Sequence, residues 1–187
     1  MGPNPSTGVD FAAHYREWLG SAEVRELTER LNTDINAVPH VESLTEYAMP
    51  AQTLEQSVAQ ATDVVIGRVQ NLAFACHARV LTFQVERSFK NQASSSIELS
   101  LGGGLEQGQS GTAVLVDDDA QPQYPVGTRP ALIIERIDDT RYGVFPFTGS
   151  YELTGGIVAT RPGNPEYGRL NGLPEPQLVA TIEDALR

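Results

Sequence analysis

Asp63-Val-Val-Ile-Gly-Arg-Val69 and Val80-Leu-Thr-Phe-Gln-Val-Glu-Arg-Ser-Phe-Lys-Asn91 are the two segments that decide the fold. The first segment is apolar at both odd and even positions, which is typical of a β-strand that is buried on both faces. Gly67 inside it indicates a β-bulge or a sharp coil. In the second segment the apolar residues Leu81 and Phe83 alternate with polar ones, which predicts a half-buried strand.

Further strands are predicted along the chain after these two. Short apolar or alternating segments, separated by glycines or polar turns, extend over residues 97–101, 111–116, 131–137, 141–148 and 151–160. The sequence therefore predicts a mainly β (β+α) chain. Five or six strands of this length suit a small closed barrel, because closure hides the sheet edges that otherwise template aggregation.

The N-terminal part is predicted to be helical and to lie outside the barrel. Residues 1–9 are predicted to form a flexible tail, and residues 10–50 a helical extension followed by a linker. Phe11, Tyr15 and Trp18 lie on one apolar stripe at helical spacing. This stripe needs a surface to pack on, which is either the chain's own barrel or a partner protein.

Residues 51–187 are predicted to form the barrel domain, which is preceded and closed by helices. Thr53 and Gln56 match the capping box at a helix start, in which each side chain bonds the backbone N–H of the other residue. Residues 174–187 carry an apolar face at helical spacing, which predicts a C-terminal helix.

The order of these segments resembles a broad group of bacterial OB-fold-like proteins, similar to the netrin and tissue-inhibitor-of-metalloproteinases (TIMP) barrel. The resemblance covers roughly Thr53 to Arg187. It rests on patterns of apolar residues and turns in the segments 61–69, 80–91, 97–103, 124–134 and 155–158.

The resemblance implies a five-stranded OB-like Greek-key barrel with helices packed beside it. It also implies an exported or surface protein of a bacterium. The animal inhibitors chelate a protease zinc through an N-terminal cysteine, whereas this chain starts with Met1-Gly2-Pro3 and its only cysteine, Cys76, is internal. Metalloprotease inhibition by the same mechanism is therefore not expected.

The net charge of −11 argues against a nucleic-acid partner, because a phosphate backbone is repelled by an acidic protein. Lys90 is the only lysine, and the arginines are scattered rather than clustered. No apolar run approaches the length of about 18 residues that a membrane span needs. A lipid anchor remains an alternative if a leader is removed from the native protein.

No cofactor is expected, and metal binding has one weak candidate. The three histidines are far apart in the sequence and show no zinc-ligand spacing. Asp117, Asp118 and Asp119 form the densest run of charge, but the run lacks the glycine and the distal glutamate of a calcium loop. We therefore expect a solvated loop here, with weak calcium binding as the alternative.

Four aromatic residues near the last predicted hairpin form the remaining candidate site: Tyr142, Phe145, Phe147 and Tyr151. Exposed aromatic rings can form a platform for sugars or peptides. Packing in the core is the simpler interpretation of the same residues.

The sequence contains no nucleophile motif, so we expect a non-enzymatic β-barrel module that binds a protein partner or assembles with itself. Two alternatives remain. One is a small-ligand or glycan-binding protein, or a hydrolytic one, that uses the aromatic hairpin and the acidic loop. The other is a protease inhibitor that acts through barrel loops.

Overall fold

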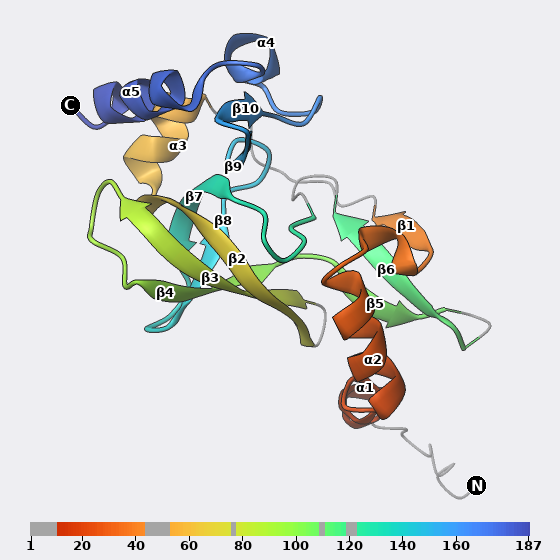
Figure 1. The fold of residues 1–187 in the computed structure, drawn as a ribbon. Helices are drawn as coiled ribbons and strands as arrows, with labels where there is room; N and C mark the ends of the chain where they lie inside the picture. Colours follow the sequence, from red (N-terminus) through yellow and green to blue (C-terminus); the bar gives the residue numbers. More distant parts are fainter. Residues whose placement is uncertain (1–10, 44–52, 76–77, 109–110, 119–122) are drawn as a thin grey trace, which may run out of the picture.

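The computed structural model describes residues 11–43, 53–75, 78–108, 111–118 and 123–187 (Figure 1). The helices are α1 (Phe11–Leu19), α2 (Ala22–Leu31), the 3-10 helix η1 (Ile35–Ala37), α3 (Leu54–Gln60), α4 (Tyr167–Leu170) and α5 (Glu175–Ala185). The strands are β1 (His40–Ser43), β2 (Asp63–Ala75), β3 (Ala78–Ser88), β4 (Ser96–Leu101), β5 (Gly104–Gln107), β6 (Ala113–Asp118), β7 (Pro130–Arg136), β8 (Arg141–Val144), β9 (Ser150–Thr154) and β10 (Ile157–Ala159). None of these helices has both the length and the apolar character that a membrane-spanning helix needs.

The strands form two sheets. A seven-stranded sheet has the order β10-β9-β7-β2-β3-β4-β8, and β8 also pairs with β7, so the pairings from β7 through β2, β3, β4 and β8 return to β7. A smaller sheet has the order β1-β6-β5. The predicted mainly β (β+α) class is confirmed, and the described residues hold ten strands in two sheets.

The long strand β2 bends at Gly67, as its sequence predicts. Its register against β3 shifts between Ile66 and Gly67, which is the irregularity that a β-bulge produces. A Cβ atom at Gly67 would lie only 2.0 Å from the backbone oxygen of Gln84, so only glycine allows the two strands this close approach.

The N-terminal helices pack on the chain's own sheets. Ser21 caps α2 by accepting a hydrogen bond from the backbone N–H of Val24 at 3.2 Å. Val24, Leu27 and Leu31 of α2 belong to the same buried cluster as side chains of β2, β3, β4 and β5. Figure 1 shows α1 and α2 beside the small sheet, away from α3 and α5.

A second buried cluster lies between α3, α5 and the strands β2, β7, β9 and β10. The capping box that begins α3 is present, with Thr53 Oγ1 accepting from Gln56 N–H and Gln56 Oε1 accepting from Thr53 N–H. Leu178 and Ile182 of α5 are fully buried, as the apolar face of the predicted C-terminal helix requires.

The part of residues 10–50 that follows the two helices, expected to be a linker, contains regular structure where it is described. Residues 35–37 form η1, and β1 pairs in parallel with β6 through residues 40–43. Asp117 and Asp118, which were expected to lie in an acidic loop, belong to β6.

Candidate functional site

Of the helix residues expected to pack either on the chain's own barrel or on a partner, Tyr15 and Trp18 contact this chain. Trp18 is half-buried against the cluster beneath α2, and the Tyr15 ring lies 5.6 Å from the Trp18 ring. The Tyr15 hydroxyl donates a hydrogen bond to the backbone oxygen of Leu105 in β5. Phe11 begins α1, but its side chain is outside the described part.

The aromatic residues of the last hairpins do not form an exposed platform. Tyr142, Phe145 and Tyr151 are all at least nine-tenths buried, in one or the other core cluster. Phe147 alone among the four retains substantial exposure, at 36%. Its φ angle of 57° lies in the left-handed region, in the turn between β8 and β9. The binding-platform interpretation is therefore wrong for the three buried rings.

Of the three aspartates considered as a weak calcium site, only Asp117 has a described side chain. Asp117 points Oδ2 at Nδ1 of His40, 2.7 Å away, and its Oδ1 accepts a hydrogen bond from the Gln123 amide. The side chain of Asp118 and all of Asp119 lie outside the described residues. Within the described part of the chain, no three histidine, cysteine or acidic side chains gather as metal ligands would.

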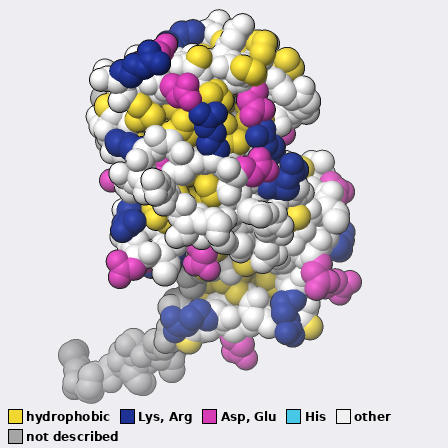
Figure 2. All heavy atoms as spheres, turned by 60° about the vertical axis from the view of Figure 1, so that its left-hand side comes forward, with side chains coloured by type: hydrophobic (Ala, Val, Ile, Leu, Met, Phe, Trp, Pro, Cys, Tyr) yellow, Lys and Arg dark blue, Asp and Glu magenta, His cyan; other side chains and the backbone are white. Residues whose placement is uncertain are grey.

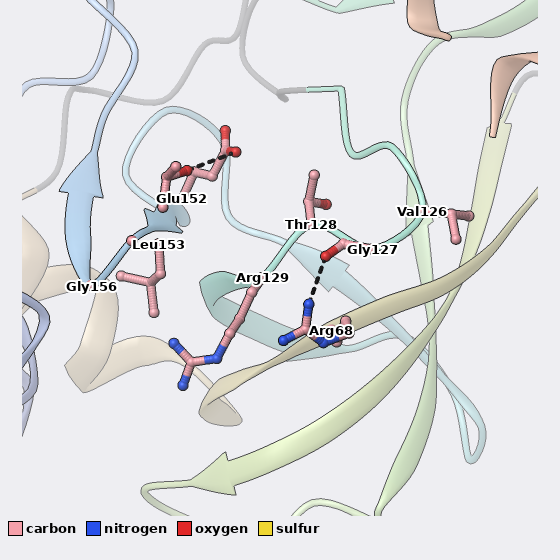
Figure 3. A pocket seen from close by; sticks show the side chains of 10 residues that line it. Arg68, Val126, Gly127, Thr128, Arg129, Glu152, Leu153 and Gly156 are labelled. Atoms are coloured by element: carbon pink, nitrogen blue, oxygen red, sulfur yellow. Dashed lines mark hydrogen bonds between the residues drawn. The ribbon is translucent and has the colours of Figure 1, made fainter. Parts of the chain in front are cut away.

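An open cleft with a volume of about 580 Å³ lies on one side of the large sheet, beside β7 and β9 (Figure 3). One wall is the segment that enters β7, from Val126 to Arg129, and the opposite wall is the β9–β10 hairpin from Glu152 to Gly156. Arg68 of β2 lies at its base, where Nη1 donates a 2.9 Å hydrogen bond to the oxygen of Gly127.

Backbone hydrogen bonds hold the two walls in place. Val69 of β2 exchanges bonds with the first wall, accepting from Gly127 N–H at 2.9 Å and donating to Thr128 O at 3.0 Å. The hairpin turn consists of Gly155 and Gly156, both with positive φ, which a two-residue turn of this kind requires. Both walls are therefore fixed to strands of the large sheet.

Carboxylates surround the arginines at the cleft. Arg129 donates to both oxygens of Glu175, at 2.8 and 3.1 Å, and to Glu86 at 2.6 Å. Its hydrogen bonds to Glu175 raise the pKa of the Arg129 guanidinium above its ordinary value. Burial lowers this pKa, and the hydrogen bond to Glu86 raises it again. Figure 2 shows a similar mixture of charges on one face of the molecule, where basic and acidic side chains lie beside one another rather than in separate patches.

The chemistry that these groups offer is hydrogen bonding. Among the described residues that line the cleft there is no histidine or cysteine to act as a base or nucleophile. The Thr128 hydroxyl donates to the oxygen of Pro125, and the Thr154 hydroxyl donates to Glu152. The Arg68 side chain is 47% exposed, and its Nε lies 3.8 Å from Glu86 Oε1.

The cleft residues are not among the candidate site residues predicted from the sequence, although two signals are present in it. Arg68 is a charged residue within the apolar run from Val64 to Val69, next to a bulge. The Pro125-Val126-Gly127 and Gly155-Gly156 turns mark the walls. That these turns face each other depends on the pairing of β7 with β9, which no local pattern reveals.

Comparison with known proteins adds no assignment: no protein-family model matches this chain, and no curated protein is matched by its sequence.

Proposed function

We propose that this chain is a non-enzymatic binding module in which an OB-like barrel presents the cleft to a protein partner. Support for the barrel comes from the strand pairings. The order from β7 through β2, β3, β4 and β8 returns to β7, and the β4–β8 pair is parallel whereas the other four pairs are antiparallel. A ring of five strands with one parallel pair is what a closed Greek-key barrel would produce.

The relationship to bacterial OB-fold-like proteins of the netrin and TIMP type is part of the same proposal. The apolar and turn patterns of β2, β3, β4 and β7 support it, as does the order of the elements between α3 and α5. Its implication of an exported or surface protein is likewise proposed.

The observation that carries the binding function is the cleft itself. It is wide and open, and its walls are exposed backbone and polar side chains on rigid strands. Protein interfaces are rich in arginine and depend on such preorganised surfaces. Small-molecule sites, in contrast, are enclosed and mostly apolar.

The mixed charge of the cleft indicates the kind of partner. Arg68 and Arg129 are balanced by Glu86, Glu152 and Glu175, so the cleft has no large excess of either sign. Val126 adds an exposed apolar side chain at one wall. An extended protein segment with polar and apolar side chains matches this surface better than a polyanion does.

Photo-cross-linking tests the proposal. A photoreactive amino acid is placed at Val126 in the cleft wall and, as the control, at Ile137, an exposed apolar residue that directly follows β7. In cells that naturally produce the chain, a defined adduct should form from position 126 and not from 137. Equal adducts from both positions, or none, would count against the cleft, and an adduct of two copies would indicate self-assembly.

A further inference from the structure

The turn after α4 contains the only Asn-Gly dipeptide of the sequence, Asn171-Gly172. Asparagine is a thermally labile residue, because the backbone nitrogen of the residue that follows can attack its side-chain amide. A glycine in that following position leaves the nitrogen unhindered, since glycine has no Cβ atom. Both residues are exposed, so water and dissolved base reach them.

Each residue of this dipeptide has a role in the turn. Gly172 follows the C-cap residue of α4 with a φ angle of 83°, in the left-handed region that favours glycine. Asn171 Oδ1 accepts a hydrogen bond from the backbone N–H of Thr160 at 3.0 Å. The turn that leads from α4 back to β10 therefore contains a chemically reactive pair.

The fold holds the two groups that would react. The backbone N–H of Gly172 donates to the oxygen of Val158 in β10 at 2.8 Å. Attack on Cγ of Asn171 requires this nitrogen to leave Val158 and to lose its proton. The hydrogen bond from Thr160 holds the side-chain amide of Asn171 as well. The closed turn therefore resists the reaction.

The segment that must open is short and lies at the edge of the large sheet. Leu173 O accepts from Val158 N–H at 2.8 Å, and Glu175 N–H donates to Gly156 O at 2.8 Å. Residues 172–175 thus cover the outer edge of β10, whose other edge pairs with β9. Edge segments of this kind open locally at a lower free energy than the whole domain needs to unfold.

We propose that Asn171-Gly172 is a deamidation site that becomes reactive when residues 171–175 separate from β10. The Gly172 nitrogen gives its proton to a base in the solvent and bonds to Cγ of Asn171. The C–N bond of the side-chain amide breaks, and the amide group leaves as ammonia with a proton from water. A water molecule then opens the cyclic imide, which gives aspartate or isoaspartate at position 171. The site is independent of the cleft and of its partner.

The isoaspartate product changes the edge of the sheet. Its main chain runs through the former side chain and is longer by a methylene group, so Gly172 and Leu173 lose their register with Val158. The outer edge of β10 then loses its cover. An uncovered strand edge is a template for pairing with another chain.

Mass spectrometry of the proteolytic fragment that contains position 171 measures the reaction, after the full chain is incubated at mildly alkaline pH. A synthetic peptide of residues 167–175, and the full chain in denaturing urea, give the rate without the fold. We expect the folded chain to react at least about tenfold more slowly than both. Equal rates in the folded chain and in the peptide would overturn the proposal.

Val158→Ala tests whether the opening is local. Val158 is 1% exposed and packs in the cluster between α3, α5 and the sheet, so its truncation should ease the separation and speed the reaction about tenfold. Val24→Ala is the matched control, because Val24 is equally apolar and 3% exposed but belongs to the cluster that includes α2. It should change the rate by less than about twofold. Equal acceleration by both variants would mean that global unfolding controls the reaction, against the proposal.

Amide hydrogen exchange at Gly172 tests the same opening without any substitution. The ratio of the deamidation rates in the folded chain and in the peptide should equal the fraction of time for which the Gly172 N–H is open, within about threefold. Agreement supports the proposed opening. Deamidation much faster than this fraction allows would show that the closed turn reacts, and would overturn the proposal.

Discussion

His40 and Asp117 join the neighbouring strands β1 and β6, with Nδ1 of the histidine 2.7 Å from Oδ2 of the aspartate. The other ring nitrogen, Nε2, lies 2.7 Å from the backbone oxygen of Ile35. Both partners accept hydrogen bonds, and histidine has two N–H donors only when it is protonated. The geometry therefore fits the imidazolium form.

The pKa of His40 should accordingly lie above its ordinary value of 6.5. Partial burial lowers this pKa, but the hydrogen bonds to Asp117 and Ile35 and the charge of Asp117 together outweigh it. Because the folded-state pKa is raised, the stabilisation is fully present below pH 6.5 and is lost as the pH rises through the folded-state value.

An NMR titration of the histidine ring protons measures this pKa, with His40→Gln to assign the signal. Asp117→Asn should lower it, since the negative charge is removed. The effect on the free energy of unfolding is expected to be at most about 1 kcal/mol, because the pair is partly exposed. A His40 pKa at or below 6.5 would show that the pair does not form in solution.

Asp63→Asn should destabilise the chain by about 2–3 kcal/mol. The buried Asp63 carboxylate accepts hydrogen bonds from Ser88 Oγ at 2.6 Å and from the backbone N–H groups of Val64, Lys90 and Ala93 at 2.7, 3.0 and 3.1 Å. The asparagine amide has one acceptor oxygen in place of two. Its NH₂ group would face the N–H and O–H groups that donate to the carboxylate, so donors would lie against donors. Urea unfolding measures the loss.

Asp139→Asn is the matched control for this change, since Asp139 is exposed in the turn before β8. It should alter the free energy of unfolding by less than about 0.5 kcal/mol. Equal effects of the two variants would mean that Asp63 does not organise the turn after β3.

Lys90→Met should loosen the C-terminal end of α3. The Lys90 ammonium donates to the backbone oxygens of Val58, Ala59 and Ala61 at 3.2, 3.1 and 2.7 Å, where the helix dipole is negative. Methionine keeps most of the apolar stem and removes the charge, so we expect a loss of about 1–2 kcal/mol. Faster amide hydrogen exchange in α3 should accompany it, and unchanged exchange there would contradict this role.

Gly67→Ala tests the bulge of β2. The added Cβ would meet the oxygen of Gln84 at 2.0 Å, so strands β2 and β3 would have to separate. We expect a destabilisation of about 3 kcal/mol or more. Gly163→Ala is the control, because a Cβ there meets nothing within 4 Å. Similar melting temperatures for the two variants would refute the close approach.

Local patterns predicted the parts of the fold that depend on neighbouring residues. The capping box at Thr53 and the bulge at Gly67 follow from side chains and backbone within a few positions. The strands β1 and β5 have four residues each, too few to show a period, and both depend on pairing with the distant β6. These two strands could therefore not be predicted from the local sequence pattern.

Burial of particular side chains was harder to predict than the strands themselves. Arg79 has the same parity in β3 as Leu81 and Phe83, and all three are buried. Alternation therefore contained the information, but a buried arginine is credible only once its partners Gly102 and Gln123 are seen. The cleft likewise depends on two turns that meet only through the pairing of β7 and β9.

The most direct test of the binding function is the affinity of the cross-linked partner, once purified, for the original chain and for Val126→Arg, measured by isothermal titration calorimetry. A charged, bulky side chain in the cleft wall should weaken binding at least about tenfold, or about 1.4 kcal/mol. Ile137→Arg, at a more exposed apolar residue outside the cleft, should leave the affinity unchanged. Equal affinity of the original chain and Val126→Arg would contradict the proposal that the cleft is the binding site.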